Sequence, residues 1–185
     1  MAEDAYLLPP HGSYRGLKAF QNTVIIHDAT VAFCRRFFKN SDRTVDQMVQ
    51  AARSGKQNIA EGSSMSGTSK ASELKLIGVA RASLEELLND YEDFLRQRSL
   101  SVWPKGHEKA EFIRRLAYRE GKSYETYRTY VEEKSPETAA NTMICVIRQT
   151  CFLLDRLKKQ LGQALLEEGG INERIYRERK KRRGY

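Results

Sequence analysis

Apolar residues return every three or four positions over long stretches of this 185-residue chain, and this spacing constrains its fold most. In residues 69–98 and 136–168 the spacing places leucine, isoleucine and aromatic side chains along one stripe of a helix. No alternating pattern typical of a half-buried strand runs for any length. The same helical spacing, less clearly developed, occurs in residues 16–40 and in a segment that begins near Arg43 or Thr44. The sequence therefore predicts an all-α protein, an antiparallel up-and-down four-helix bundle.

The ends of these helices carry recognisable capping residues. Asn40, Ser41 and Asp42 can cap the second long helix, and Ser69 can cap the third. Ser135 precedes Pro136, a favoured first helical residue, and Gly169-Gly170 stops the last long helix. Gly62 and Gly67 are predicted to close the second helix and form a tight loop. The predicted apolar faces of the first and second helices are, respectively, Leu17, Phe20, Val24, Val31, Cys34 and Phe38, and Val45, Met48, Val49, Ala52 and Ile59.

The length is that of about one domain, large enough to bury a core without disulfides or metals. Residues 1–15 form a loosely ordered lead-in, because Pro9-Pro10 and Gly12 interrupt any helix. The bundle is expected over 16–168, with a helical insertion at 107–134 between its third and fourth helices. Residues 169–185 form a basic C-terminal suffix.

Three tyrosines of the insertion, Tyr124, Tyr127 and Tyr130, are spaced three apart beside Arg128. Aromatic rings next to arginine can stack on unpaired bases. Half-buried tyrosines also commonly pack a segment onto a core while the hydroxyl stays wet. Packing is the favoured interpretation.

The positive charge is concentrated at one end of the chain. The net charge is +8, and residues 171–185 contribute +5 of it, with seven basic residues against Glu173 and Glu178. Such a block can neutralise phosphates and release counterions, so we expect nucleic-acid contact there; the alternative is a disordered tail that only aids solubility. The basic residues are Arg174, Arg177, Arg179, Lys180, Lys181, Arg182 and Arg183.

Residues for catalysis or metal binding do not form a recognisable pattern. The sequence lacks a P-loop and the GxGxxG, GxSxG and HExxH motifs, and its three histidines, at 11, 27 and 107, have no metal-ligand spacing. The glutamate-rich run LEELLNDYED lacks the Glu-x-x-His pairs of di-iron bundles. His27 is expected to be a core residue, and Cys34, Cys145 and Cys151 to be buried reduced thiols. We therefore expect no catalytic residues, metal or cofactor, and a cytoplasmic protein without a signal peptide or membrane span.

Residues 51–88 carry a two-part pattern: an NIAEG turn, a Ser/Lys loop with an acidic residue, and an Ala-Arg-Ala-Ser-x-x-Glu helix. This pattern resembles the four-helix-bundle family that includes proteins encoded in 23S rRNA intervening sequences and accessory proteins of diversity-generating retroelements. The chain also resembles the longer branch with a four-helix-bundle suffix. The resemblance implies a bacterial homopentamer with a basic surface, and RNA or DNA binding in the retroelement branch. The matching residues are Asn58, Ile59, Ala60, Glu61 and Gly62, then Ser69, Lys70 and Glu73, then Ala80, Arg81, Ala82, Ser83 and Glu86.

The motif residues also permit a physical interpretation of their own. Arg81 falls near the apolar stripe, so it needs a carboxylate partner, for which Glu61 or Glu86 of the same or a neighbouring protomer would serve. The motif is therefore expected to be a packing and subunit-contact element. Direct nucleic-acid contact is predicted at Arg53, Lys56, Lys70, Lys75 and the tail.

These observations predict a non-enzymatic, oligomeric protein that binds nucleic acid, structured RNA above all, through a basic bundle surface and tail. A ring of copies would multiply modest contacts into avidity. The alternative is a protein-interaction scaffold or an accessory subunit for a partner such as a reverse transcriptase.

Overall fold

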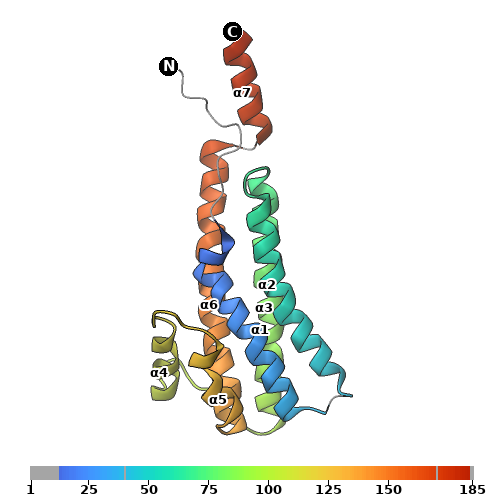
Figure 1. Ribbon diagram of the computed structural model, residues 1–185, viewed down its shortest axis with the longest axis vertical. Helices are drawn as coiled ribbons and strands as arrows, with labels where there is room; N and C mark the ends of the chain where they lie inside the picture. The colour runs from blue at the N-terminus through green and yellow to red at the C-terminus, as the bar shows by residue number, and fades with distance from the viewer. Residues whose placement is uncertain (1–12, 40, 170, 184–185) are drawn as a thin grey trace.

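The computed structural model describes residues 13–39, 41–169 and 171–183, and every regular element in these ranges is helical (Figure 1). The prediction of an all-α protein is therefore confirmed. Within the described ranges, no helix has both the length and the apolarity needed to cross a bilayer. The elements are η1 (Tyr14–Gly16), α1 (Lys18–Phe37), α2 (Arg43–Met65), α3 (Lys70–Gln97), α4 (Glu108–Leu116), η2 (Tyr124–Thr126), α5 (Arg128–Glu132), α6 (Pro136–Glu168) and α7 (Ile171–Arg183).

The four long helices α1, α2, α3 and α6 lie side by side. α1 packs on α2, α2 on α3, α3 on α6, and α6 again on α1. The colour gradient in Figure 1 shows α1 and α3 running in one direction and α2 and α6 in the other. Their arrangement is compatible with a helical bundle.

The predicted helix caps are present at three N-termini. The side chain of Asp42 accepts a hydrogen bond from the Thr44 N–H at 2.9 Å, and Ser69 accepts from the Ser72 N–H at 3.1 Å. Ser135 accepts from the Thr138 N–H at 3.2 Å. These bonds satisfy donors that the first helical turn leaves unpaired. The position of each helix start was therefore readable from the sequence.

The predicted end of the second helix at Gly62 is wrong. α2 continues through Gly62 to Met65, and Gly62 is buried within the helix. A Cβ atom at this position would lie 3.3 Å from the Cβ of Leu76 on α3. The missing side chain therefore allows α2 and α3 to approach closely, which explains the glycine without a helix end.

The predicted apolar face of the first helix also needs correction. Val24 and Val31 are only half-buried, and Cys34 alone of the predicted stripe is fully buried. The reason is that α1 contacts α2, α6, α5 and η2, so its buried arc is wide and rotated relative to the expected stripe. The side chains in that arc are Ala19, Asn22, Thr23, Ile25, Ile26, Ala29, Thr30, Phe33 and Cys34.

α6 is buried on all sides near its N-terminal end. Every residue from 139 to 147 is buried, although a single apolar stripe was expected. α6 contacts α1 and α3 of the bundle, and it also contacts α4 and α5 of the insertion. The insertion therefore completes the core.

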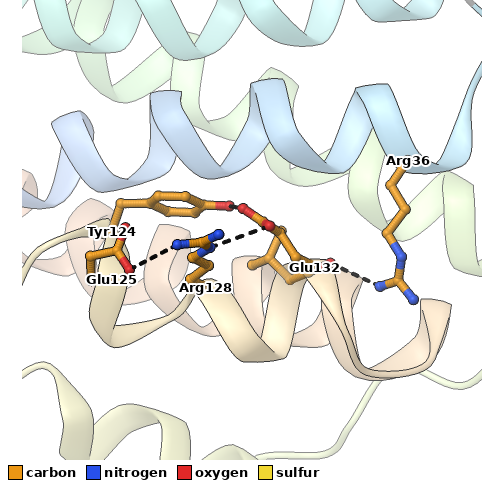
Figure 2. A network of polar contacts seen from close by, with 6 residues as sticks. Arg36, Tyr124, Glu125, Arg128 and Glu132 are labelled. Carbon is orange, nitrogen blue, oxygen red and sulfur yellow. Dashed lines mark hydrogen bonds and ion pairs between the residues drawn. The ribbon is translucent and has the colours of Figure 1, made fainter.

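One hydrogen bond from Arg36 attaches the insertion to α1, and further polar contacts hold the insertion together internally (Figure 2). The Arg36 guanidinium donates to the carbonyl oxygen of Val131 at 2.9 Å, and the Tyr124 hydroxyl donates to Glu132 Oε1 at 2.5 Å. Arg128 pairs with Glu125 and Glu132. The tyrosines confirm the packing interpretation, because Tyr127 is buried and Tyr124 and Tyr130 pack against the core.

Candidate nucleic-acid interface

Residues 171–183 of the basic suffix form a helix. α7 spans Ile171–Arg183, is rich in charged residues, and makes no substantial packing contact with the other described elements. Figure 1 shows it beyond the end of α6, at the end of the molecule opposite α4 and α5. The side chains of Arg174 and Lys181 lie outside the described part of the chain. The side chains of Arg177, Arg179, Lys180, Arg182 and Arg183 are exposed.

The four cations predicted on the second and third helices differ in exposure and in their level along the bundle. Arg53 and Lys75 are exposed, whereas Lys56 and Lys70 are half-buried. Two glycines of α2 show how α2 and α3 are aligned along their length: Gly55 faces Leu84, and Gly62 faces Glu73 and Leu76. Lys75 therefore lies near the level of Gly62, about 13 Å along the helix axis from Arg53.

The groove between α2 and α3 is acidic. Asp46, Glu86 and Asp90 line it together with Ser54 and Ser83. Burial raises the pKa of Asp90, and the nearby charges of Asp93 and Glu86 raise it further. Clustered carboxylates repel phosphate, so this groove does not suit a nucleic-acid backbone.

Within the chain, the carboxylate partners of Arg81 differ from those that the sequence predicted. Arg81 forms ion pairs with Glu85 at 2.5 Å and with Asp155 on α6 at 3.3 Å, and neither Glu61 nor Glu86 takes this role. The i,i+4 spacing places Glu85 on the same face of α3. Arg81 thus connects α3 to α6.

Two other motif residues form hydrogen bonds within α2 or between α2 and α3. Asn58 donates to the carbonyl oxygen of Ser54 at 2.9 Å, and Ser83 donates to Ser54 Oγ at 3.0 Å across the α2–α3 contact. Glu61 is exposed. Glu73 is buried, and this burial raises its pKa, which Lys70 partly offsets.

A basic cleft that the sequence did not reveal lies between α4 and α6, with the start of α1 beside it. We call it the α4–α6 cleft; its volume is about 670 Å³. No carboxylate is among its lining residues. The lining cations are Lys18, Lys105, Arg114, Lys122, Arg148 and Arg156.

Most of this charge has no carboxylate beside it. Arg148 pairs with Glu92 on α3 at 2.7 Å. Arg114 donates instead to the backbone carbonyl of Lys105, and Lys122 donates to the carbonyl of Ala117 at 2.7 Å. Burial lowers the pKa of Lys122, and the charge of Lys18 lowers it further. The cleft therefore carries excess positive charge.

Aromatic side chains border the same cleft. Tyr118 is 83% exposed and Phe152 is 61% exposed, unusually open positions for large rings, whereas Trp103 is buried. The amide nitrogen of Gln149 donates to the carbonyl of Arg114 at 3.0 Å, which ties α6 to α4. Gln149 Oε1 is buried without a hydrogen-bond partner among the described residues.

Sequence reasoning missed the cleft because its cations come from α1, the 98–107 connection, α4, the loop after α4, and α6. Each cation alone has the pattern of a solvated surface charge. The only local signal is a group of three arginines in the insertion, Arg114, Arg115 and Arg119. Of these three, Arg114 alone lines the cleft.

Metal ligands do not come together in the part of the chain described here: no group of three or more His, Cys, Asp or Glu residues could hold an ion. Cys34, Cys145 and Cys151 are buried free thiols, as predicted. His27 is partly exposed and contacts Asp28, and His107 stacks on Trp103 with ring centroids 5.0 Å apart. His11 lies outside the described residues.

Comparison of the chain with protein-family models, curated proteins and solved structures found no match.

Proposed function

We propose that this protein is a non-enzymatic nucleic-acid-binding protein whose main ligand is structured RNA. The observation that carries the proposal is α7, a helix with five exposed cations and no extensive packing against the other described elements. A helix this rich in charged residues gains little by packing on its own chain. Its exposed arginines and lysines suit phosphate oxygens, which arginine binds in a bidentate manner.

We propose an up-and-down four-helix bundle that forms a homo-oligomer, a pentamer being the number implied by the family resemblance, in the cytoplasm. Several copies of α7 on one assembly would raise affinity through effective concentration, without new contacts. Native mass measurement tests this part, and a monomer at micromolar concentration contradicts it.

The salt dependence of binding tests the role of α7. Fluorescence anisotropy measures the affinity of the nuclease-treated full chain for an RNA hairpin over a salt series. Each phosphate contact contributes about 0.9 to the slope of log K against log salt. We expect Lys180→Gln with Arg183→Gln to lower the slope by about 1.8.

The matched control removes the same charge elsewhere. Lys39 and Arg43 are exposed at the connection between α1 and α2, far along the chain from α7. Lys39→Gln with Arg43→Gln should leave the slope within about 0.5 of the parent value. Equal slopes for the two double variants overturn the role of α7. If the parent binds no nucleic acid at low salt, the protein-partner scaffold becomes the better proposal.

A further inference from the structure

We propose that the α4–α6 cleft binds an unpaired nucleotide of a single-stranded segment, with its phosphate on the cleft cations and its base against Tyr118 or Phe152. This inference rests on the proposed nucleic-acid function and names a site that α7 does not include. The recognised chemistry is a phosphate joined to a flat aromatic ring. A single strand presents this unit with the base accessible.

The charge of the cleft selects an anion. Five of its six cations, all except Arg148, have no ion-pair partner among the described residues. Holding so many like charges together is unfavourable unless an anion joins them. Lys159 lies one helical turn beyond Arg156 on the same side of α6, and it extends the basic surface towards α7.

The two exposed rings select a ligand with a flat apolar part. Tyr118 and Phe152 line the same cleft, and exposed apolar side chains that gather at one groove mark a ligand-binding surface. Stacking of a base on an aromatic side chain contributes about 1–3 kcal/mol and tolerates any base, since every base has a π-face. A bare phosphate would leave Tyr118 and Phe152 unused.

The shape of the cleft favours a single strand over a duplex. Its volume of about 670 Å³ falls within the range of small-ligand pockets, about 300–1,000 Å³. A duplex keeps its bases stacked inside the helix, out of reach of the rings. One or two unstacked nucleotides, by contrast, expose both the phosphate and the base to the cleft.

The test measures anisotropy of a labelled, non-self-complementary RNA of about 12 nucleotides with the full chain. We expect Tyr118→Ala with Phe152→Ala to weaken binding at least about 10-fold, while Tyr118→Phe retains parent affinity. Lys105→Gln with Arg156→Gln should lower the salt slope by about 1.4, at about 0.7 per phosphate contact for a single strand. Circular dichroism confirms that the variants keep the helical content of the parent.

Controls separate this inference from the proposed function. The Lys39→Gln and Arg43→Gln pair removes equal charge outside the cleft and should not change the slope. If the α7 variant weakens binding and the cleft variants do not, the cleft assignment is wrong while the proposed function stands. If the parent binds the hairpin but not the single strand, the cleft assignment is likewise overturned.

A competition arm distinguishes a strand from a free nucleotide. Adenosine monophosphate carries one phosphate and one base, so it should displace the labelled RNA only at concentrations at least about 100-fold above the RNA dissociation constant. Displacement at equal concentration, lost in the Tyr118→Ala and Phe152→Ala variant, would assign the cleft to free nucleotides and overturn the single-strand proposal.

Discussion

Asn141 on α6 accepts a hydrogen bond from the backbone N–H of Trp103 at 2.7 Å, and both residues are buried. The amide nitrogen of Asn141 also donates to the carbonyls of Ser101 at 2.8 Å and Glu137 at 2.9 Å. One side chain therefore holds the 98–107 connection against α6. This contact therefore positions the connection that contributes Trp103 and Lys105 to the lining of the α4–α6 cleft.

Replacing Asn141 should be strongly destabilising. Asn141→Ala leaves the buried Trp103 N–H without an acceptor, which costs about 1–3 kcal/mol in addition to the lost bonds. We expect the free energy of unfolding in urea to fall by about 2–3 kcal/mol. Asn89→Ala, at an exposed position of α3, is the control and should change it by less than about 0.5 kcal/mol. Equal effects of the two variants would contradict the structural role of Asn141.

Two glycines inside helices should respond to alanine in opposite directions. Gly78 on α3 has open space where a Cβ would stand, so Gly78→Ala should raise stability by about 0.5–1 kcal/mol through helix propensity. At Gly62 a Cβ would lie 3.4 Å from the Glu73 carbonyl as well as close to Leu76. Gly62→Ala forces α2 and α3 apart, and we expect thermal unfolding at a lower temperature than for the parent. A stabilised Gly62→Ala chain would contradict the close approach of these helices.

The buried carboxyl of Glu73 should make stability depend on pH. Burial raises its pKa above the ordinary value of 4.5, so ionisation is less favourable in the folded chain than in the unfolded chain. The free energy of unfolding therefore decreases, through this group, as pH rises from about 4.5 through the folded pKa. We expect Glu73→Gln to be more stable than the parent at pH 7 and to lose this advantage below about pH 4.

Urea unfolding at pH 7 and below about pH 4 measures the free energy of unfolding of Glu73→Gln, with Glu61→Gln as the comparison. Glu61 is exposed on α2, so its replacement removes a carboxylate that remains in water. An advantage of Glu73→Gln that is the same at both pH values would show that ionisation is not its cause.

The contact between Arg36 and Val131 should control the opening of the insertion (Figure 2). Arg36→Ala removes the hydrogen bond from α1 to the α5 backbone, so residues 123–133 should open locally more often. We expect their amide hydrogens to exchange about 5- to 10-fold faster, as the loss of about 1 kcal/mol implies. Exchange in α2 and α3 should not change. Arg35→Ala, at the exposed neighbouring position, provides the control, and faster exchange in both variants would assign the effect to charge alone.

Burial of the thiols should make them slow to react. Burial raises the pKa of Cys34 to about 12 and that of Cys151 to about 11. The thiolate is the reactive form, so a thiol reagent at pH 8 should label the native chain at least about 100-fold more slowly than the urea-unfolded chain. Fast labelling of the native chain, measured by absorbance, would show that these cysteines are accessible.

The local parts of the fold could be predicted because they depend on neighbours in sequence. Asp42, Ser69 and Ser135 cap their helices within three residues, and Gly169 ends α6 with a positive φ of 72°. Capping and propensity act over one helical turn, so the sequence near each end contains the needed information. The basic character of residues 171–183 was equally visible.

Features that depend on contacts between distant segments could not be predicted from a short stretch of sequence. The buried face of α1 depends on how many elements surround it, and Gly62 could be assigned to the α2–α3 contact only once Leu76 was placed opposite it. Lys18 and Arg156 line one cleft although 137 residues separate them in the sequence. The sequence by itself determined that this chain is helical and where most of its long helices begin and end, because those choices are local. The tertiary structure alone decided which side chains meet, since burial and charge clustering depend on contacts between distant segments.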